Sequence, residues 1–307
     1  MSDGRRGVVL HGTGGQWRVH LDDGSTGVAA LSGKVKHGAK QKLAVGDRVV
    51  VEGEPEDAVL AIVAIEPRRS QLARRNPSGQ RGERIVAANL DQVIVVLAVA
   101  RPEPNERMLD RFLVIAEADD LPARIVVNKT DLASEPAARA RFANYDALGY
   151  PVHYTSARSG AGLEALHDVL RGATTAFTGP SGVGKSSLMN AMYPGLDLRV
   201  GAISESVNKG RHTTVGAHMH PLPDGGYVMD TPGLREVGLW GLPSGSLDQC
   251  FPEFKALIGA CRFADCRHLT EPGCAVRIQV DAGRITADRY ASYVKLREEV
   301  TGTENEW

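Results

Sequence analysis

A glycine-rich octapeptide, Gly179 to Ser186, has the residue types and spacing needed to bind a phosphate chain. It reads Gly-Pro-Ser-Gly-Val-Gly-Lys-Ser, a full match to GxxxxGK[ST], and it follows an apolar strand pattern at Thr174 to Thr178. The glycines let backbone N–H groups turn inward around phosphate oxygens, and the N-terminus of the next helix adds its dipole. We expect Lys185 to reach the β and γ phosphates and the Ser186 hydroxyl to hold Mg²⁺.

A second motif, Asn-Lys-Thr-Asp at 128–131, fits the pattern NKxD and selects a base. The Asp131 carboxylate can accept hydrogen bonds from both N1–H and N2–H₂ of guanine. Adenine has no donors there and would leave the carboxylate unpaired, a loss of several kcal/mol. We expect Asn128 to bond the N7 edge and its own loop, and the Lys129 stem to lie along the purine face. The backbone of Thr155-Ser156-Ala157 is expected to meet guanine O6.

Two further polar segments follow the octapeptide. In Asp230-Thr231-Pro232-Gly233, the acid at a strand end can hold a Mg²⁺-bound water and the Gly233 amide can contact the γ-phosphate. Upstream of it, one of Thr213 and Thr214 is expected to complete the Mg²⁺ shell, and the sequence leaves open which. His212 could orient a water, although a lone loop histidine is also compatible with simple exposure.

These motifs together predict a site for GTP and Mg²⁺, with Ser186 as the Mg²⁺ ligand. The predicted catalytic residues are His212, Lys185, Thr213 and Thr214. The predicted nucleotide contacts are Asn128, Lys129, Asp131, Ser156, Ala157, Gly179, Ser181, Gly182, Val183, Gly184, Lys185, Ser186, Ser187, Asp230 and Gly233.

The order of the motifs is unusual, because the base loop at 128–131 precedes the phosphate loop at 179–186 and nothing after Gly233 resembles NKxD. The usual order is phosphate loop, switches, base loop. The chain therefore predicts a circularly permuted domain, whose geometry can survive because the termini of compact domains often lie close together. As a consequence, the second switch leads directly into the C-terminal segment.

Three cysteines and a histidine crowd into that segment, with the spacing C-x4-C-x-H-x5-C. Three thiolates and an imidazole complete a tetrahedral Zn²⁺ shell with no open position, so the site is predicted to be structural. A chance cluster of buried cysteines is the alternative. Cys250 falls outside the spacing and is expected to be a core residue. The zinc ligands are Cys261, Cys266, His268 and Cys274.

The elements that must position the loops alternate between strand and helix from about residue 90, which is typical of a doubly wound α/β sheet with ligand loops at the strand C-termini. A helix capped by Asn105 is expected after the first strand, and helical residues at 288–300 should pack against the metal loop. The predicted strands are 93–99, 125–127, 152–154, 174–178 and 227–229, with a further helix at 162–170.

Residues 1–66 carry short strand patterns separated by turns and no helical pattern, which favours a small β-barrel of the OB type, with another small β-domain as the alternative. A basic stretch, 67–85, follows and is expected to be an exposed, flexible linker. Together with the barrel lysines it is a candidate for contact with RNA phosphates. Those lysines are Lys34, Lys36, Lys40 and Lys42.

Length, charge and apolar runs exclude some classes of protein. The chain has 307 residues and a net charge of −1, which excludes a uniformly basic nucleic-acid binder. Its longest apolar run, Val93 to Ala100, is too short to span a bilayer, and the first residues do not resemble a secretory signal. We expect a cytoplasmic protein without membrane contact, and a monomer, since nothing demands a dimer.

Jointly, the two loops, the segment Gly210-Arg211-His212-Thr213-Thr214, Asp230 to Gly233 and the zinc spacing resemble the ribosome small-subunit-dependent GTPase A family over nearly the whole chain. The resemblance implies an OB-fold, GTP hydrolysis stimulated by the small (30S) subunit, and a role in late maturation of that subunit. It also implies that the OB and zinc domains contact 16S rRNA. Leu234 stands where many GTPases carry a glutamine that positions water, so we predict slow hydrolysis by the chain alone.

The predicted fold is multidomain: an OB-fold RNA-binding domain (1–66), the basic linker (67–85), a circularly permuted α/β P-loop GTPase domain (86–243) and a small zinc-binding domain with helices (244–307). Two other functions fit the sequence less well. An RNA-binding assembly factor with a mainly structural nucleotide site is disfavoured by the intact Lys185, Ser186, Asp131 and Asp230. A metabolic kinase is disfavoured by the guanine-reading motif.

Overall fold

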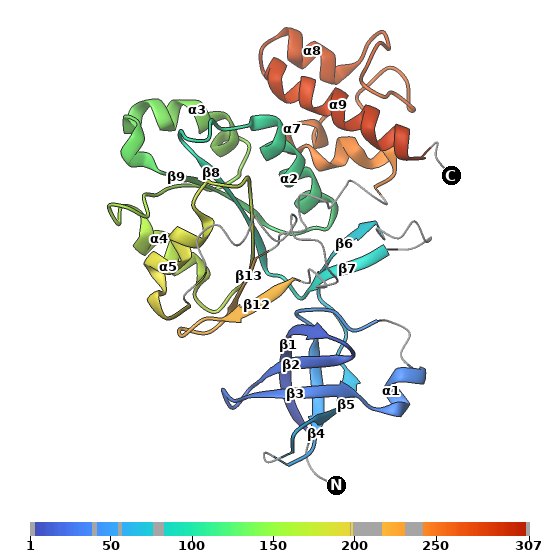
Figure 1. The fold of residues 1–307 in the computed structure, drawn as a ribbon. Coiled ribbons are helices and arrows are strands. Elements are labelled where there is room, and N and C mark those ends of the chain that lie inside the picture. Colours follow the sequence, from blue (N-terminus) through green and yellow to red (C-terminus); the bar gives the residue numbers. More distant parts are fainter. Residues whose placement is uncertain are drawn as a thin grey trace.

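The computed structural model describes residues 4–38, 42–54, 57–75, 83–196, 198, 217–230 and 242–304. In chain order these residues form a barrel, a two-stranded hairpin, an α/β sheet and a helical C-terminal module (Figure 1). Within the described ranges, no helix combines the length and the apolar character needed to cross a bilayer.

The N-terminal body is a closed five-stranded barrel with strand order β1-β2-β3-β5-β4. Its core comes from alternation along each strand: Val49 and Val51 of β4 point inward, as do Leu60 and Ile62 of β5. The predicted N-terminal barrel is confirmed, and the structure adds a strand and a helix that the sequence had not indicated, β3 and α1. The elements are β1 (Arg5–Thr13), β2 (Gln16–Leu21), β3 (Thr26–Leu31), α1 (Gly33–Gly38), β4 (Arg48–Glu52) and β5 (Leu60–Ile65).

The predicted linker differs from an exposed, flexible chain. It contains strand β6 (Gln71–Arg75), which pairs antiparallel with β7 (Glu83–Ala88). The side chain of Leu72 is fully buried. Arg68 fixes the hairpin to the barrel, since its Nε donates to Asp47 Oδ1 at 2.7 Å and both side chains are buried. Basic residues alone therefore do not establish exposure, because here one arginine is neutralised inside the fold.

The central body is a six-stranded sheet of order β10-β9-β8-β11-β13-β12, parallel except for β12. Strand β11, which precedes the phosphate loop, lies in the middle of the sheet between β8 and β13. The predicted α/β sheet is therefore confirmed; strand β12 was not predicted. The strands are β8 (Gln92–Ala98), β9 (Ala123–Asn128), β10 (Val152–Tyr154), β11 (Thr174–Thr178), β12 (His218–Pro221) and β13 (Tyr227–Asp230).

Every residue of β8 is buried, because helices cover both faces of the sheet. Val93, Val95 and Leu97 pack with α2 on one face, and the alternate residues of the strand pack with α4 and α5 on the other. Asn105 caps α2 as predicted, its side chain accepting from the backbone N–H of Met108. The helices are α2 (Glu106–Ala118), α3 (Glu135–Ala147), α4 (Leu163–Leu170) and α5 (Lys185–Met192), with the 3-10 turns η1 (Thr130–Leu132) and η2 (Pro194–Leu196).

The C-terminal module shares its hydrophobic core with the sheet domain rather than forming a separate one. Phe251, Phe254 and Tyr293 are fully buried and belong to the same cluster as the α2 side chains. Figure 1 shows the module lying against α2. Cys250 is buried in this cluster, as predicted. The elements are η4 (Ser244–Cys250), α7 (Pro252–Lys255), α8 (Ala275–Asp281) and α9 (Ala287–Glu304).

Histidines line the contact between the barrel and the sheet. The ring of His11 on β1 lies 4.7 Å, centroid to centroid, from that of His218 on β12. A second contact joins the same two bodies, since His20 Nδ1 on β2 shares a hydrogen bond of 2.9 Å with the Tyr227 hydroxyl on β13. Burial lowers the pKa of His11, His218 and His220, and for His11 the neighbouring His218 and Arg18 lower it further. The contact thus favours neutral imidazoles.

We expect this contact to weaken as the pH falls below about 6.5, because the three histidines then bind more protons in the unfolded chain than in the folded one. Above that pH the stabilisation is fully present. The measurement is the midpoint of thermal unfolding at pH 7.5 and 5.5, for the wild type and a double His11→Gln, His218→Gln variant. The variant should lose less stability on acidification; equal losses would show that other groups cause the pH dependence.

Candidate functional site

The phosphate loop connects β11 to α5, at the carboxyl end of the central strand. Two glycines in it have a left-handed backbone and no room for a Cβ. Gly179 has φ +134°, and a Cβ there would lie 2.1 Å from the carbonyl oxygen of Val96 on β8. Gly184 has φ +95°, and a Cβ there would lie 2.5 Å from Asn128 Nδ2. Steric closeness to β8 and to the base loop therefore requires glycine at both positions.

The two residues predicted to hold phosphate and Mg²⁺ begin α5. Lys185 Nζ donates to the carbonyl oxygens of Gly179 and Pro180, both at 2.9 Å, so its side chain curls over the loop. Ser186 is buried at the first turn of the helix. A concave loop with a lysine above it and a helix N-terminus behind it can bind a phosphate chain.

The base loop is tied directly to the phosphate loop. Asn128 ends β9 with its side chain buried, and its Nδ2 donates to the Val183 carbonyl at 2.8 Å. Its Oδ1 accepts from the Ala157 N–H at 3.3 Å and from the Thr155 hydroxyl at 3.4 Å. The predicted contact of Asn128 with the N7 edge of guanine stays a prediction. The structure adds that Asn128 joins its own loop to the phosphate loop and to the loop of Thr155 and Ala157.

The remaining base-reading residues lie beside this joint. Lys129 adopts a left-handed conformation, φ +62°, and its Nζ donates to the Gly182 carbonyl at 2.6 Å and to the carbonyl of Arg101. Asp131 Oδ1 accepts from the Ser156 hydroxyl at 2.6 Å. Ser156 thereby fixes the carboxylate that is predicted to read guanine. Arg101, in the loop after β8, carries no sequence motif, and only the folded chain brings its carbonyl to Lys129.

Several predicted site residues lie outside the described part of the chain: His212, Thr213, Thr214, Gly233 and the side chain of Asp230. The backbone of Asp230 is described, and it ends β13 beside the phosphate-loop strand β11. The predicted roles of these residues stay predictions. The structure does bring together the phosphate loop and both base loops, although Asn128 lies 55 residues from Val183 and 29 residues from Ala157 in the chain.

The second site is the cluster of Cys261, Cys266, His268 and Cys274, whose ligand atoms all lie within 4.8 Å of one another. His268 Nδ1 lies 3.6 Å from Cys261 Sγ, 3.6 Å from Cys266 Sγ and 3.4 Å from Cys274 Sγ. A tetrahedral Zn²⁺ with usual bond lengths separates sulfur and nitrogen ligands by about 3.6 Å. The four side chains therefore fit a tetrahedral metal ion.

Helix α9 and one carboxylate organise the loop that carries these ligands. The hydroxyls of Tyr290 and Tyr293 donate to the carbonyls of His268 and Arg267 at 2.7 and 2.9 Å, which confirms the predicted packing of this helix on the metal loop. Glu271 accepts from the backbone N–H groups of residues 267, 269 and 270. Burial raises the pKa of Glu271, but these donors outweigh it and bring the pKa to about 2. These hydrogen bonds fix the backbone of the loop that carries the ligands.

Comparison with known proteins gives a consistent result. A family model described as RsgA GTPase matches residues 65–240. The "Small ribosomal subunit biogenesis GTPase RsgA" of Gemmatimonas aurantiaca is 59% identical over 305 residues, which cover 98% of this chain and 99% of that protein. The protein of the same name from Azotobacter vinelandii is 42% identical over 296 residues, which cover 94% of this chain and 84% of that protein.

Two solved structures are similar over almost the whole chain. YjeQ from Thermotoga maritima has a TM-score of 0.79 and 35% identity, covering 97% of this chain and 99% of its own. YloQ, described as a circularly permuted GTPase, has a TM-score of 0.77 and 27% identity, covering 98% of this chain and 96% of its own. The motif order that indicated a permuted domain is thus also that of a solved relative.

Proposed function

The chain belongs to the RsgA GTPase family, and from this membership we propose that it acts in biogenesis of the small ribosomal subunit. It is a GTPase, and hydrolysis of GTP in this class uses Mg²⁺. The observation that carries the GTP-binding part of the proposal is the contact between base loop and phosphate loop, where Asn128 donates to the Val183 carbonyl and Ser156 donates to Asp131. A site organised in this way binds guanine and phosphates as one unit.

Within the site, Lys185 neutralises the β and γ phosphates and Ser186 binds Mg²⁺. Asp131 accepts from the two guanine donors. Asp230 and Gly233 take the second-switch role, and either Thr213 or Thr214 completes the Mg²⁺ shell. These assignments rest on the motifs and on the positions of the described loops. The small subunit stimulates turnover because the chain alone, with Leu234 after Gly233, has no side chain there to orient water.

The decisive test measures GTP turnover by the purified protein with and without small ribosomal subunits. We expect the rate to rise at least about tenfold with small subunits, as partner-stimulated GTPases do, and to stay at the basal level with large subunits. Lys185→Ala should be inactive under both conditions. Equal rates with and without small subunits would contradict the proposed partner and leave a GTPase with another one.

We assign His212 as the residue that orients the attacking water once the switches are ordered. His212→Ala should lower subunit-stimulated turnover by about a hundredfold, the usual size of such a contribution, while GTP binding stays intact. Turnover is followed by phosphate release and binding by a fluorescent GDP analogue. Stimulated turnover at the wild-type rate would refute the assignment.

The metal of the Cys₃His cluster is zinc in this proposal, because three thiolates and an imidazole without an open position suit a structural Zn²⁺. Elemental analysis of the purified protein should give one zinc per chain, and Cys274→Ser should give none. Cys250→Ser is the matched control, since this buried thiol lies outside the cluster and its loss should leave the zinc in place. Another metal, or full retention by Cys274→Ser, would contradict the assignment.

The remaining parts of the proposal concern partners and location. The barrel and the metal module contact 16S rRNA, supported by the basic residues of the barrel and the hairpin. The protein acts in the cytoplasm as a monomer. The domain ranges 1–66, 67–85, 86–243 and 244–307 are working boundaries for deletion experiments.

A further inference from the structure

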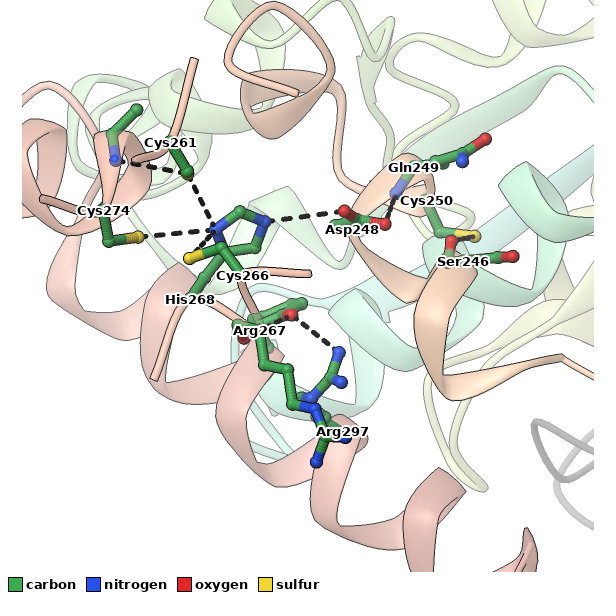
Figure 2. A network of polar contacts seen from close by, with 12 residues as sticks. Ser246, Asp248, Gln249, Cys250, Cys261, Cys266, Arg267, His268, Cys274 and Arg297 are labelled. Carbon is green, nitrogen blue, oxygen red and sulfur yellow. Dashed lines mark hydrogen bonds and ion pairs between the residues drawn. The ribbon is translucent and has the colours of Figure 1, made fainter. Parts of the chain in front are cut away.

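The imidazole of His268 lies between the cysteine cluster and an acidic residue from another element (Figure 2). Its Nδ1 faces the three sulfur atoms at 3.4–3.6 Å. Its Nε2 lies 3.5 Å from Asp248 Oδ2. The His268 side chain is 4% exposed, and among the described residues no hydrogen bond reaches its buried Nε2. The Nδ1 atom thus faces the cysteine cluster, and the acidic oxygen that faces the unpartnered Nε2 is Asp248 Oδ2.

The chemistry of a histidine ligand makes this arrangement significant. A neutral imidazole carries one proton, so Nδ1 can bind a metal only when the proton is on Nε2. A buried N–H needs an acceptor. Asp248 supplies one: its Oδ1 accepts from the backbone N–H of Gln249 at 2.9 Å, which leaves Oδ2 free to face His268. Carboxylates in this outer position fix the tautomer and the orientation of metal-binding histidines.

We propose that Asp248 is a positioning residue of the metal centre, which holds the Nε2 proton of His268 and so presents Nδ1 to the metal. Asp248 does not come from the metal loop. It belongs to η4, the first described element after the second-switch segment. The proposal rests on the assignment of a metal to the Cys₃His cluster.

A second contact attaches the same element to the metal loop. Arg297 on α9 donates through Nη1 to the Ser244 carbonyl at 2.8 Å and to the Tyr293 hydroxyl at 3.1 Å, and Tyr293 in turn donates to the Arg267 carbonyl. In Figure 2, Arg267 and Arg297 lie below the contact between His268 and Asp248. Ser244 begins η4 and Asp248 is its fifth residue. Asp248 faces the ligand His268 directly, whereas Ser244 is connected to the Arg267 carbonyl through Arg297 and Tyr293.

The test compares Asp248→Ala and Asp248→Asn with Asp265→Asn, a matched control that alters an exposed carboxylate in the metal loop itself. The rate at which a chromophoric chelator removes zinc from the full-length protein is measured for each. Loss of an outer partner typically costs 10- to 100-fold in metal affinity, so we expect about that increase in rate for Asp248→Ala. The amide oxygen of Asp248→Asn can still accept from Nε2–H, so zinc removal from this variant should be faster than from the wild type and slower than from Asp248→Ala. Zinc removal from Asp265→Asn should be as slow as from the wild type.

Nitrogen-15 NMR of the histidine side chains gives a readout that a merely structural role would not change. The Nε2–H of His268 should exchange slowly with solvent in the wild type and in Asp248→Asn, and at least about tenfold faster in Asp248→Ala. Wild-type zinc retention and exchange in Asp248→Ala would overturn the proposal while leaving the metal site intact. If the wild type holds no zinc, or Cys274→Ser holds as much as the wild type, the metal assignment fails, and the role of Asp248 fails with it.

Discussion

Replacing Asp131 with asparagine should lower the affinity for GTP about a thousandfold and turn the preference toward xanthosine triphosphate. Two hydrogen bonds to a charged group are worth about 1.5–3 kcal/mol each, and the new amide N–H₂ would face the guanine N2–H₂, donor against donor. Xanthine carries an oxygen at that position and can accept instead. The Ser156 hydroxyl donates to Asp131 Oδ1 at 2.6 Å. In the variant it would donate to the amide oxygen in the same way, which leaves the amide N–H₂ on the side away from Ser156.

The measurement is displacement of a fluorescent GDP analogue by GTP, XTP and ATP. Ser156→Ala is the matched control, because it removes the hydroxyl that orients the carboxylate but keeps the carboxylate itself. It should weaken GTP binding by only about tenfold, with the order of preference unchanged. Wild-type GTP affinity in the Asp131→Asn variant would show that another residue reads the base.

Local chemistry made part of this site predictable from sequence. The phosphate loop, the NKxD motif and the Cys₃His spacing each place their residues within a few positions of one another, so the arrangement is encoded in one segment. The cap of α2 by Asn105 belongs to the same class, since the side chain bonds the N–H three residues ahead. The circular permutation was also predictable, because it depends only on which motif comes first in the chain.

Contacts between distant segments were not predictable. Asn128 bonds Val183, 55 residues away, only because sheet order brings β9 and β11 to either side of β8. His268 faces Asp248, which lies in another element with no motif of its own. The role expected for Asn128 was accordingly incomplete, and Asp248 was missed.

Weak local signals account for the missed elements. Strand β3 has only Thr26 and Val28 as β-branched residues beside Gly27 and two alanines, and β12 reads His-Met-His-Pro with none, so the strand signal is weak in both. The hairpin at β6 looked like a linker because arginines surround Leu72. Its order comes from tertiary contacts, above all the buried pair of Arg68 and Asp47, which the sequence does not reveal.

A buried charge network between the C-terminal module and the sheet domain leads to the largest expected loss of stability. Arg289 on α9 is almost fully buried; its Nη1 donates to Asp110 Oδ1 on α2 at 2.6 Å, and its Nε and Nη2 donate to Glu253 on α7 at 2.8 and 3.1 Å. The Tyr145 hydroxyl of α3 also donates to Asp110, at 2.9 Å. One guanidinium thus joins three helices and neutralises two carboxylates. Arg289→Met should lower the free energy of unfolding by about 3–5 kcal/mol, because two buried carboxylates then lose their counter-charge.

Urea unfolding followed by circular dichroism measures this loss, and two further variants identify its cause. Arg171→Met breaks an exposed pair with Asp168, 3.1 Å apart, and should cost less than about 1 kcal/mol. Adding Asp110→Asn and Glu253→Gln to Arg289→Met removes the two buried carboxylates that have lost their counter-charge. The triple variant should therefore regain a large part of the lost free energy of unfolding, because the loss comes from unpaired buried charge. A loss for Arg289→Met no larger than that for Arg171→Met would mean that the shared core of Phe251, Phe254 and Tyr293 alone holds the module to the sheet. If Arg289→Met loses about 3–5 kcal/mol and the triple variant recovers a large part of it, the buried ion pairs of Arg289 are needed to hold the metal module against the GTPase domain.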